Sequence, residues 1–322
     1  MTLTNPQPAP DSSQPDPLVG KLVGGYTLGP LLARGGMGNV HIAAHRHLDR
    51  QVAVKTARRD LGGHDFLQAR LEAEADFLAR VQHVNVALLY DLVYGDDGTL
   101  FVVLELLEGR DLANIIDHRG SLELPVAIRL AREIARGAAA LHDQGIVNGD
   151  LKPANVMVVD GPLVGQPGSG RTWVKLFDLG AARDLGESPR DIILGSPEYM
   201  APEAVLGQPL DARSDVYGLG MLLYEMLSGD VPFYDTDVDA NLRMHLWKQP
   251  PPVSTHRADI VADGALDRLV RDCMARRPDA RPASMRVFLD RLDEAVSSDA
   301  DVRLTGPLLA DPPQQTQALQ LG

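Results

Sequence analysis

The chain is poor in cysteine, and this scarcity limits both its covalent structure and its location. Cys273 is the only cysteine among 322 residues, so a disulfide within the chain is excluded and a reducing, intracellular compartment is indicated. We expect Cys273 to be a small buried residue of a late helix rather than a catalytic thiol. The N-terminal residues are proline-rich and polar, which is unlike a signal peptide. These features predict a cytoplasmic protein.

Long apolar runs and basic charge are also scarce. No run of about 18 uncharged apolar residues occurs, so no membrane span is expected. Lys and Arg number 31 against 44 Asp and Glu, a net charge of -13. A nucleic-acid-binding protein needs a basic surface, so this class is disfavoured. The charge is compatible with basic protein substrates, and it leaves the oligomeric state open.

Composition divides the chain into a central domain and two tails. Residues 1–21 and 296–322 are rich in proline and small polar residues, and we expect both segments to be disordered. The intervening residues 22–295 form one continuous domain. Its first part, about 22–106, has the pattern of strands, and its second part, about 107–295, is mainly helical. The sequence therefore predicts an α+β fold with a small β-rich lobe and a larger α-helical lobe.

Periodicity predicts the elements of both parts. Strands are expected at Tyr26–Leu32, Asn39–Ala44, Gln51–Ala57, Ala87–Val93, Thr99–Leu104, Val156–Val159 and Trp173–Phe177. Apolar residues at helical spacing predict helices at Leu67–Leu78, Val126–Leu141, Ser214–Leu227, Ala265–Ala275 and Met285–Ala295. Gly145 is expected to end its helix as a left-handed cap, and the Gly/Pro-rich insert 161–170 is expected to be a surface loop.

The segment 148–155, with the letters N-G-D-L-K-P-A-N, supplies polar groups suited to phosphoryl transfer. Asp150 can orient an attacking hydroxyl and accept its proton, and Lys152 can neutralise charge on the transferred phosphate. Asn155 and Asp178 carry oxygen atoms of the kind that bind magnesium. Asp178 begins a second short motif, D-L-G.

These two motifs closely resemble those of the eukaryotic-like (Hanks-type) bacterial Ser/Thr protein kinase family, which usually read H-R-D-L-K-P-x-N and D-F-G. The resemblance implies a two-lobed kinase fold that uses ATP and Mg²⁺, with Mn²⁺ as an alternative ion. It also implies protein substrates that accept phosphate on serine or threonine. Lys152 favours these acceptors over tyrosine.

A glycine cluster follows the first predicted strand and is similar to the kinase G-x-G-x-x-G-x-V loop. Glycine allows backbone amides to approach phosphate closely. The first glycine of the family pattern is replaced here by alanine. The resemblance assigns nucleotide contacts to Leu32, Ala33, Arg34, Gly35, Gly36, Met37, Gly38, Asn39 and Val40.

Lys55 lies in the strand motif V-A-V-K and is assigned to the nucleotide phosphates. A lysine in an apolar strand needs a charged partner. By family spacing that partner is Glu74, with Glu72 as the rival. The family's hinge between lobes corresponds to residues 104–111. The adenosine contacts that the resemblance assigns are Leu104, Glu105 and Leu107, Asp111 at the ribose, and Val40, Ala53 and Met157 around the base.

Three departures surround the catalytic motifs. Asn148 and Gly149 replace the family's histidine and arginine, and Leu179 replaces the phenylalanine of D-F-G. The arginine usually docks a phosphate on the activation loop, so its loss predicts little dependence on loop phosphorylation. The segment 178–203 contains no threonine, and only Ser188 and Ser196 carry aliphatic hydroxyls. By the resemblance Ser196 binds the catalytic Asp and Lys and has a structural role.

Later motifs extend the resemblance to about Leu292. Glu203 of A-P-E is expected to pair with Arg281, and Asp215 is expected to brace the catalytic loop. His41, His45 and His47 are interpreted as surface histidines rather than metal ligands. Trp247 is interpreted as a packing residue of the helical lobe.

Two alternative hypotheses stand beside the protein kinase interpretation. A pseudokinase, acting as a nucleotide-binding switch or scaffold, is favoured by Ala33 and by the three departures at 148, 149 and 179. It is disfavoured because all six polar residues of the kinase set are present, namely Lys55, Glu74, Asp150, Lys152, Asn155 and Asp178. A small-molecule kinase of related fold is disfavoured by the complete A-P-E segment and the helices that follow it.

Overall fold

The structure is a computed structural model that describes residues 16–36, 38–59, 63–160, 172–187 and 195–298. Two compact units divide the chain. The first contains the residues up to Ala79 together with Leu88–Leu107, and the second contains Arg80–Ala87 and the residues from Glu108 onward. The first is built around a β-sheet and the second is mainly helical, which confirms the predicted α+β class. Among the described residues, none of the helices has both the length and the apolar character of a membrane-spanning segment.

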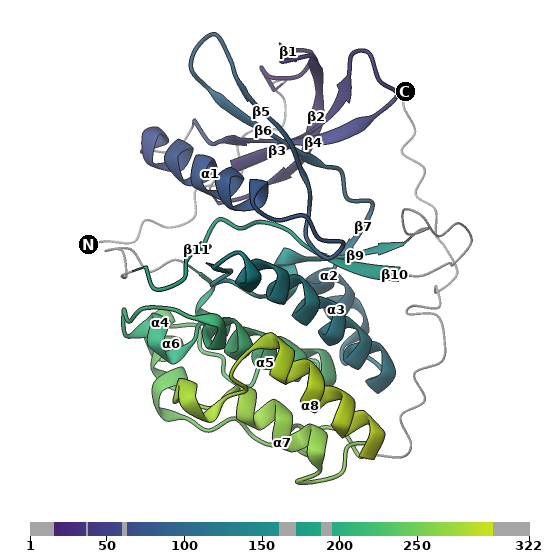
Figure 1. Cartoon of the computed structure of the whole chain (residues 1–322), viewed down its shortest axis with the longest axis vertical. Helices are drawn as coiled ribbons and strands as arrows, with labels where there is room; N and C mark the ends of the chain where they lie inside the picture. The colour runs from purple at the N-terminus through teal and green to yellow at the C-terminus, as the bar shows by residue number, and fades with distance from the viewer. Residues whose placement is uncertain (1–15, 37, 60–62, 161–171, 188–194, 299–322) are drawn as a thin grey trace. The chain divides into compact units, whose positions relative to one another are not determined.

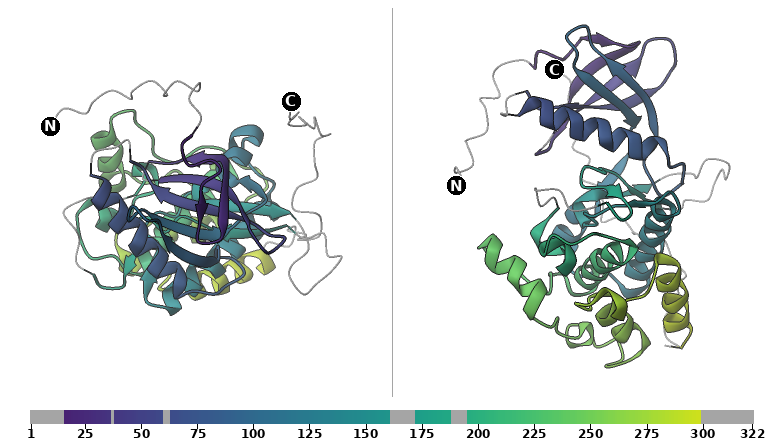
Figure 2. Two further views of the ribbon diagram at one scale, coloured as in Figure 1. Left: turned by 90° about the horizontal axis from the view of Figure 1, so that it is seen from above. Right: turned by 60° about the vertical axis from the view of Figure 1, so that its left-hand side comes forward.

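The first unit consists of one antiparallel sheet and one helix (Figures 1 and 2). Its strand order is β1-β2-β3-β4-β6-β5. The strands are β1 (Leu22–Val23), β2 (Tyr26–Arg34), β3 (Gly38–His45), β4 (Gln51–Ala57), β5 (Leu89–Tyr94) and β6 (Leu100–Glu105). Helix α1 (His64–Ala79) packs against β4, β5 and β6. The sheet therefore presents one face to α1 through an apolar layer.

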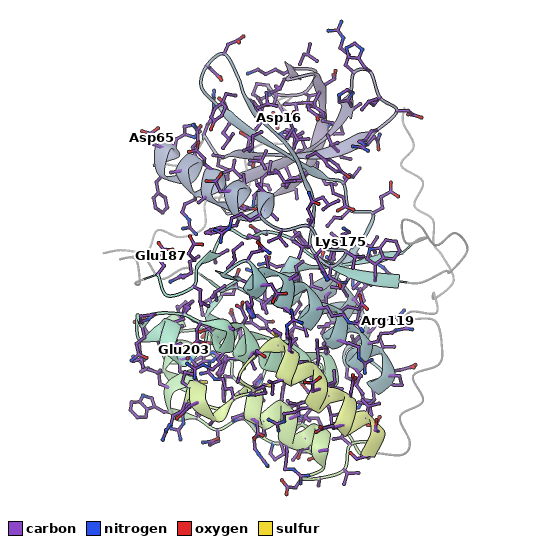
Figure 3. The ribbon with its side chains drawn as sticks, in the orientation of Figure 1. Asp16, Asp65, Arg119, Lys175, Glu187 and Glu203 are labelled. Carbon is purple, nitrogen blue, oxygen red and sulfur yellow. The ribbon has the colours of Figure 1, made fainter. Side chains whose placement is uncertain are left out.

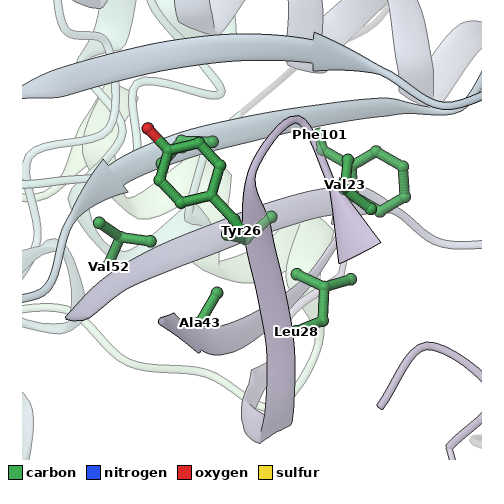
Figure 4. Packing of buried hydrophobic residues seen from close by; sticks show 8 residues of the cluster. Val23, Tyr26, Leu28, Ala43, Val52 and Phe101 are labelled. Carbon is green, nitrogen blue, oxygen red and sulfur yellow. The ribbon is translucent and has the colours of Figure 1, made fainter. Parts of the chain in front are cut away.

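Two apolar clusters occupy the first unit. One of them joins β1, β2, β3, β4 and β6, and Figure 4 shows it from close by. Its buried members are Val23, Tyr26, Leu28, Ala43, Val52, Val54, Phe101 and Val103. The second cluster joins α1 to the sheet and comprises Ala57, Leu71, Ala75, Leu100 and Val102. Burying each of the larger apolar side chains contributes about 1.5–3 kcal/mol to stability, and this burial holds the β-rich unit together.

The end of the predicted N-terminal tail has structure. Residues 16–21 of the predicted segment 1–21 form a turn, and Leu18 packs against the first apolar cluster. The amide of Gly20 donates to the carbonyl of Leu28, which ties the turn to β2. Residues 1–15 and 299–322 of the predicted tails, and the predicted surface loop 161–170, lie outside the described residues.

The second unit contains seven helices among its described residues. They are α2 (Leu112–Arg119), α3 (Leu124–Asp143), α4 (Pro202–Val205), α5 (Ala212–Ser228), α6 (Val238–Trp247), α7 (Ala265–Cys273) and α8 (Met285–Ser298). Helix α3 packs against α5 and α8, and α7 packs against both α5 and α8. Gly145 has a φ of 71° after α3, as predicted for a left-handed cap. Cys273 is fully buried, as expected, and burial raises the pKa of its thiol to about 12.

Two small sheets complete the second unit. One has the order β10-β9-β7 and the other pairs β11 with β8. The strands are β7 (Gly109–Asp111), β8 (Ile146–Val147), β9 (Val156–Asp160), β10 (Thr172–Leu176) and β11 (Arg183–Asp184). The segment 148–155 runs from the end of β8 to the start of β9, so short strands fix both of its ends.

Two interpretations of individual side chains are wrong. His41 is not a surface histidine, because its side chain is completely buried on β3 and one ring nitrogen contacts the carbonyl of Gly29 at 3.2 Å. Trp247 is not a packing residue, because it is 73% exposed. It follows His245 of α6 by two positions, and two positions turn a helix by roughly 200°, so Trp247 projects away from the buried face.

Candidate active site

The glycine cluster forms a tight hairpin turn between β2 and β3. The amide of Gly35 donates to the carbonyl of Gly38 at 2.8 Å. No heavy atom lies within 4 Å of a Cβ placed on Gly36, whereas a Cβ on Gly38 would lie 2.9 Å from the Thr56 carbonyl oxygen. Glycine is thus required at 38 by close packing, and the backbone at 36 is open to a ligand. This geometry suits phosphate.

Strand register places the other predicted nucleotide contacts of this turn. Ala33 lies opposite Val40, and Arg34 lies opposite Asn39, whose side chain accepts a bond from Arg34 Nε at 3.4 Å. Leu32 is 51% exposed. Met37, also predicted to contact the nucleotide, lies outside the described residues. The remaining members therefore lie on or beside one hairpin.

Lys55 and Glu74 form an ion pair inside the first unit. The Nζ atom of Lys55 lies 2.8 and 2.7 Å from the two carboxylate oxygens of Glu74. Their side chains are only 12% and 4% exposed. The rival Glu72 instead accepts a hydrogen bond from the hydroxyl of Tyr94. The pair holds the lysine charge at a defined place on β4, directly opposite Val40 of β3.

The predicted adenine-contacting residues of the first unit lie on adjacent strands. Ala53 of β4 lies opposite Leu104 of β6. The amide of Glu105 donates to the carbonyl of Leu88 at 2.9 Å, and its carboxylate accepts from the amide of Leu88 at 3.2 Å. The amide and the carboxylate of Glu105 are therefore both bonded to the residue that precedes β5. Leu107 is partly buried at the end of this unit.

Asp111 and Met157 lie opposite each other in the second unit, on β7 and β9. The Asp111 carboxylate caps α2, because it accepts from the amide of Asn114 at 2.8 Å and from its side chain at 2.5 Å. This cap is an addition to the features predicted from the sequence. The letters D-L-A-N contain its signal, since aspartate before a helix with a polar residue at the third position is typical of a helix start.

Asp150 is held by three donors on its two carboxylate oxygens. The amide of Ser196 donates to Oδ1 at 2.8 Å. Lys152 Nζ lies 2.8 Å from Oδ2, and the side-chain amide of Asn155 donates to the same oxygen at 3.1 Å. A carboxylate fixed in this way is ready to orient a hydroxyl and take its proton.

Asn155 and Asp178 offer the two predicted metal-binding oxygens. The amide nitrogen of Asn155 is committed to Asp150, both at the carboxylate and at the main-chain carbonyl. Its amide oxygen is thus the atom of Asn155 suited to a hard cation. Asp178 has a φ of 64°, a left-handed conformation that is uncommon outside glycine, and strain of this kind concentrates at functional sites. This donor set fits Mg²⁺ better than a softer metal.

Asp215 of α5 braces the segment before Asp150, as predicted. Its Oδ2 accepts from the amide of Asn148 at 2.8 Å, and its Oδ1 accepts from the amide of Gly149 at 2.8 Å. His142, at the end of α3, donates from Nε2 to Oδ2 at 2.7 Å. His142, which precedes the motif by six residues, was not predicted from the sequence. Because Asp215 is 2% exposed, these bonds form in a site that excludes most water.

The two departures next to Asp150 are accommodated locally. Asn148 is buried, and its side-chain oxygen accepts a bond from the amide of Asp150 at 3.0 Å. Gly149 has a φ of 73°, and a Cβ there would lie 3.1 Å from the carbonyl of Ala181. Asparagine therefore fixes the main chain of Asp150, and glycine relaxes a backbone conformation that strains other residues.

Ser196 contacts the side chains of both Asp150 and Lys152, in a different way from the prediction. Its hydroxyl accepts a bond from Lys152 Nζ at 2.6 Å, whereas its amide, and not its hydroxyl, contacts Asp150. The hydroxyl is thus engaged in the site. Ser188, the other hydroxyl of this segment, lies outside the described residues.

Glu203, at the end of the segment 178–203, forms the predicted ion pair with Arg281. Arg281 donates to the two carboxylate oxygens of Glu203 at 2.6 and 2.8 Å. Ser214 donates its hydroxyl to Glu203 at 2.7 Å, and the guanidinium lies 4.9 Å from the ring centre of Tyr217. Figure 3 labels Glu203, which belongs to α4. The pair therefore joins α4 to the N-terminal turn of α5 and to the chain before α8.

Comparison with known families identifies this arrangement of motifs. A family model described as the protein kinase domain matches residues 26–291. This match covers both compact units.

Similar proteins come from several bacteria. A serine/threonine-protein kinase PknB of Mycolicibacterium smegmatis is 34% identical over 303 residues, which cover 89% of this chain and 47% of that protein. The serine/threonine-protein kinase pkn3 of Myxococcus xanthus is 32% identical over 282 residues, 85% of this chain and 50% of the relative. PksC of Streptomyces coelicolor is 33% identical over 286 residues, with shares of 84% and 49%. The chain thus spans about half the length of the curated relatives it matches.

Proposed function

Because the chain belongs to the protein kinase domain family, we propose that it transfers the γ-phosphoryl group of ATP to serine and threonine hydroxyls of protein substrates. The observation that carries this proposal is the set of contacts at Asp150. Its two carboxylate oxygens are oriented by Ser196, Lys152 and Asn155. This group of residues places a cation and an amide suited to metal binding within hydrogen-bond distance of the base, Asp150.

Each residue of this group has a distinct task. Asp150 orients the substrate hydroxyl and accepts its proton. Lys152 stabilises the charge that develops on the transferred group, and its contact with Ser196 keeps its ammonium beside Asp150. Asn155 and Asp178 would hold Mg²⁺, with Mn²⁺ as an alternative. When bound, the ion neutralises phosphate charge.

The first unit supports the nucleotide part of the proposal. The open backbone at Gly36 would receive phosphate oxygens, and Lys55, oriented by Glu74, would contact the α- and β-phosphates. The apolar side chains of Val40, Ala53 and Leu104 provide the kind of wall that binds a flat base. The backbone of the segment 105–107 would read the adenine edge.

We also propose that activity depends little on phosphorylation of the activation segment. Gly149 supplies no cation for a phosphate, and the segment 178–203 has no threonine. The hydroxyl of Ser196 is already bonded to Lys152. Protein treated with phosphatase is expected to retain most of its transfer activity, and Ser188→Ala is expected to behave like the wild type. High occupancy of phosphate on Ser188, combined with inactivity of Ser188→Ala, would contradict this part.

The deciding experiment measures transfer of labelled phosphate from ATP, with Mg²⁺ or Mn²⁺, to the protein itself and to a basic protein substrate. Wild type is compared with Asp178→Asn, with Asp150→Asn, and with Asp293→Asn as a surface control. Transfer by wild type and the control, lost in the other two variants, is the expected result.

The same experiment tests the alternative of a pseudokinase. Asn148 and Gly149 are the residues that favour it, because they replace a usual catalytic pair. Nucleotide binding by wild-type protein without any transfer would establish the pseudokinase and reject the kinase. Calorimetric titration with ATP and Mg²⁺, run on the same preparation, supplies the binding measurement.

A further inference from the structure

The segment that follows Asp178 is attached to the helical unit by a short strand. Strand β11 has two residues, Arg183 and Asp184, which pair with Val147 and Ile146 of β8. The next amide, that of Leu185, donates to the carbonyl of Gly145 at 2.7 Å. Residues 179–182 are held by burial, whereas the exposed residues 184–186 lie on and after this short ladder, so side-chain contacts at its edge add to what holds them.

Arg80 makes such contacts with two of its guanidinium nitrogens. One nitrogen donates to the carboxylate of Asp184 at 2.7 Å, and another donates to the main-chain carbonyl of Gln144 at 2.5 Å. Gln144 is the C-terminal cap of α3, immediately before Gly145. One planar guanidinium thus connects β11 to the end of α3, beside the bond from Leu185.

The geometry makes use of properties that arginine alone has. The guanidinium presents several donors in a rigid fork, so it can bond a carboxylate and a carbonyl at once, whereas a lysine ammonium is a single point charge. The carbonyl at the end of α3 also carries the partial negative charge of a helix C-terminus, which favours a cation. Both of these acceptors therefore carry negative charge, full on Asp184 and partial on the carbonyl of Gln144.

Neither partner is deeply buried. The side chains of Arg80 and Asp184 are 39% and 58% exposed. An ion pair at this exposure adds little to the stability of a whole domain. Its effect is concentrated on the segment that it holds, and this segment begins at the proposed metal ligand Asp178.

We propose that Arg80 is a positioning residue for the transfer reaction, which holds the start of the activation segment in place through Asp184 and the carbonyl of Gln144. This inference rests on the proposed kinase function. The carboxylate of Asp184, which the sequence encodes, takes the place of a phosphate as the anion that anchors the segment, while Gly149 supplies no guanidinium to bind a phosphate. The anchor is present in protein that carries no modification.

The test is a double-mutant cycle measured on phosphatase-treated protein. Arg80→Ala and Asp184→Asn are each expected to lower kcat about two- to fivefold, the range set by a part-exposed ion pair, with the KM for ATP unchanged within about twofold. The double variant should be no slower than the slower single variant. The charge swap Arg80→Asp with Asp184→Arg should recover part of the lost kcat, and Arg80→Lys should be intermediate.

A matched control separates this role from a general loss of surface charge. The Nη2 atom of Arg286 lies 2.6 Å from the Oδ2 atom of Asp143, and this ion pair connects α8 to the end of α3. The side chains of Arg286 and Asp143 are 69% and 52% exposed. Arg286→Ala is expected to leave kcat unchanged. An equal loss of kcat in Arg286→Ala and Arg80→Ala would overturn the proposal, as would additive effects of the two single variants or a charge swap that recovers nothing.

Hydrogen exchange provides a readout that does not need activity. Peptides covering residues 179–187 are expected to exchange faster in Arg80→Ala and Asp184→Asn than in wild type, while peptides from α5 stay protected. Unchanged exchange of residues 179–187 would reject the anchor even if activity fell. If wild-type protein shows no transfer at all, the kinase function fails, and the exchange result still decides whether Arg80 holds the segment.

Discussion

Tyr199 donates its hydroxyl hydrogen bond to the carboxylate of Glu225, with an oxygen-to-oxygen distance of 2.6 Å. Tyr199 belongs to the 3₁₀ turn Pro197–Tyr199 that follows Ser196, and Glu225 lies on α5. Burial raises the pKa of the Glu225 carboxyl to about 7, although the Tyr199 bond opposes the shift. Negative charges on Asp117, Asp230 and Glu198 add to it. The pair therefore connects stability to pH near neutrality.

The pKa of Glu225 predicts a loss of stability as the pH rises. The folded-state pKa lies above the ordinary glutamate value of 4.5, so the protonated form is favoured by folding. The stabilising contribution is complete below about pH 4.5 and is lost as the pH rises through about 7. Replacing the carboxyl by the neutral amide in Glu225→Gln should increase the free energy of unfolding at pH 8 by on the order of 2 kcal/mol, with little change near pH 4.5.

Urea denaturation at several pH values measures this effect. Asp290→Asn, at an exposed position of α8, is the control and should give the same small difference at every pH. A Glu225→Gln difference that does not vary between pH 4.5 and 8 would show that the carboxyl titrates normally.

The ion pair between Glu203 and Arg281 predicts that replacing one partner destabilises the protein more than replacing both. The side chains of Glu203 and Arg281 are 5% and 0% exposed, so removing one partner leaves a buried charge without its opposite charge. Arg281→Met should reduce the free energy of unfolding by about 3–5 kcal/mol. Thermal unfolding of Arg281→Met, Glu203→Leu and the double variant checks this, because the double variant should be more stable than either single one. If the loss of unfolding free energy in the double variant equals the sum of the two single losses, the buried-charge explanation is rejected.

The backbone conformation of Gly149 predicts that arginine, the usual residue of the family at this position, would lower the stability of the protein. Its φ of 73° is strained for any residue with a side chain, and a Cβ would crowd the carbonyl of Ala181 at 3.1 Å. Gly149→Ala and Gly149→Arg should each lower the free energy of unfolding by about 1–2 kcal/mol. Chemical denaturation provides the measurement, and Gly36→Ala, at a position with open space, is expected to cost much less. Equal losses at both glycines would contradict the conformational argument.

The left-handed conformation of Asp178 predicts opposite changes in stability and activity. Its φ of 64° is strained for aspartate and free of strain for glycine. Asp178→Gly should raise the free energy of unfolding by up to about 1 kcal/mol and abolish phosphoryl transfer. Parallel unfolding and transfer assays on this variant test both parts. A variant that is destabilised as well as inactive would indicate that Asp178 is needed for folding.

The sequence alone determined the order of elements and the candidate residues, because these features depend on local patterns. Apolar periodicity located β4 and the long helices within a few residues, and the spacing of N-G-D-L-K-P-A-N and D-L-G identified the polar residues of the site. It did not locate α6, whose buried positions include the polar residues Asn241 and His245, so its apolar stripe is weak.

Only the tertiary structure decided how the departures are accommodated. Asn148 bonds the amide of Asp150, Gly149 adopts a left-handed backbone, and Arg80 reaches Asp184 across 104 residues of sequence. The burial of His41 and the exposure of Trp247 were likewise settled by packing. These features depend on contacts between segments distant in the chain and on backbone angles. Contacts of this kind cannot be inferred from residue type and spacing within a short stretch of sequence.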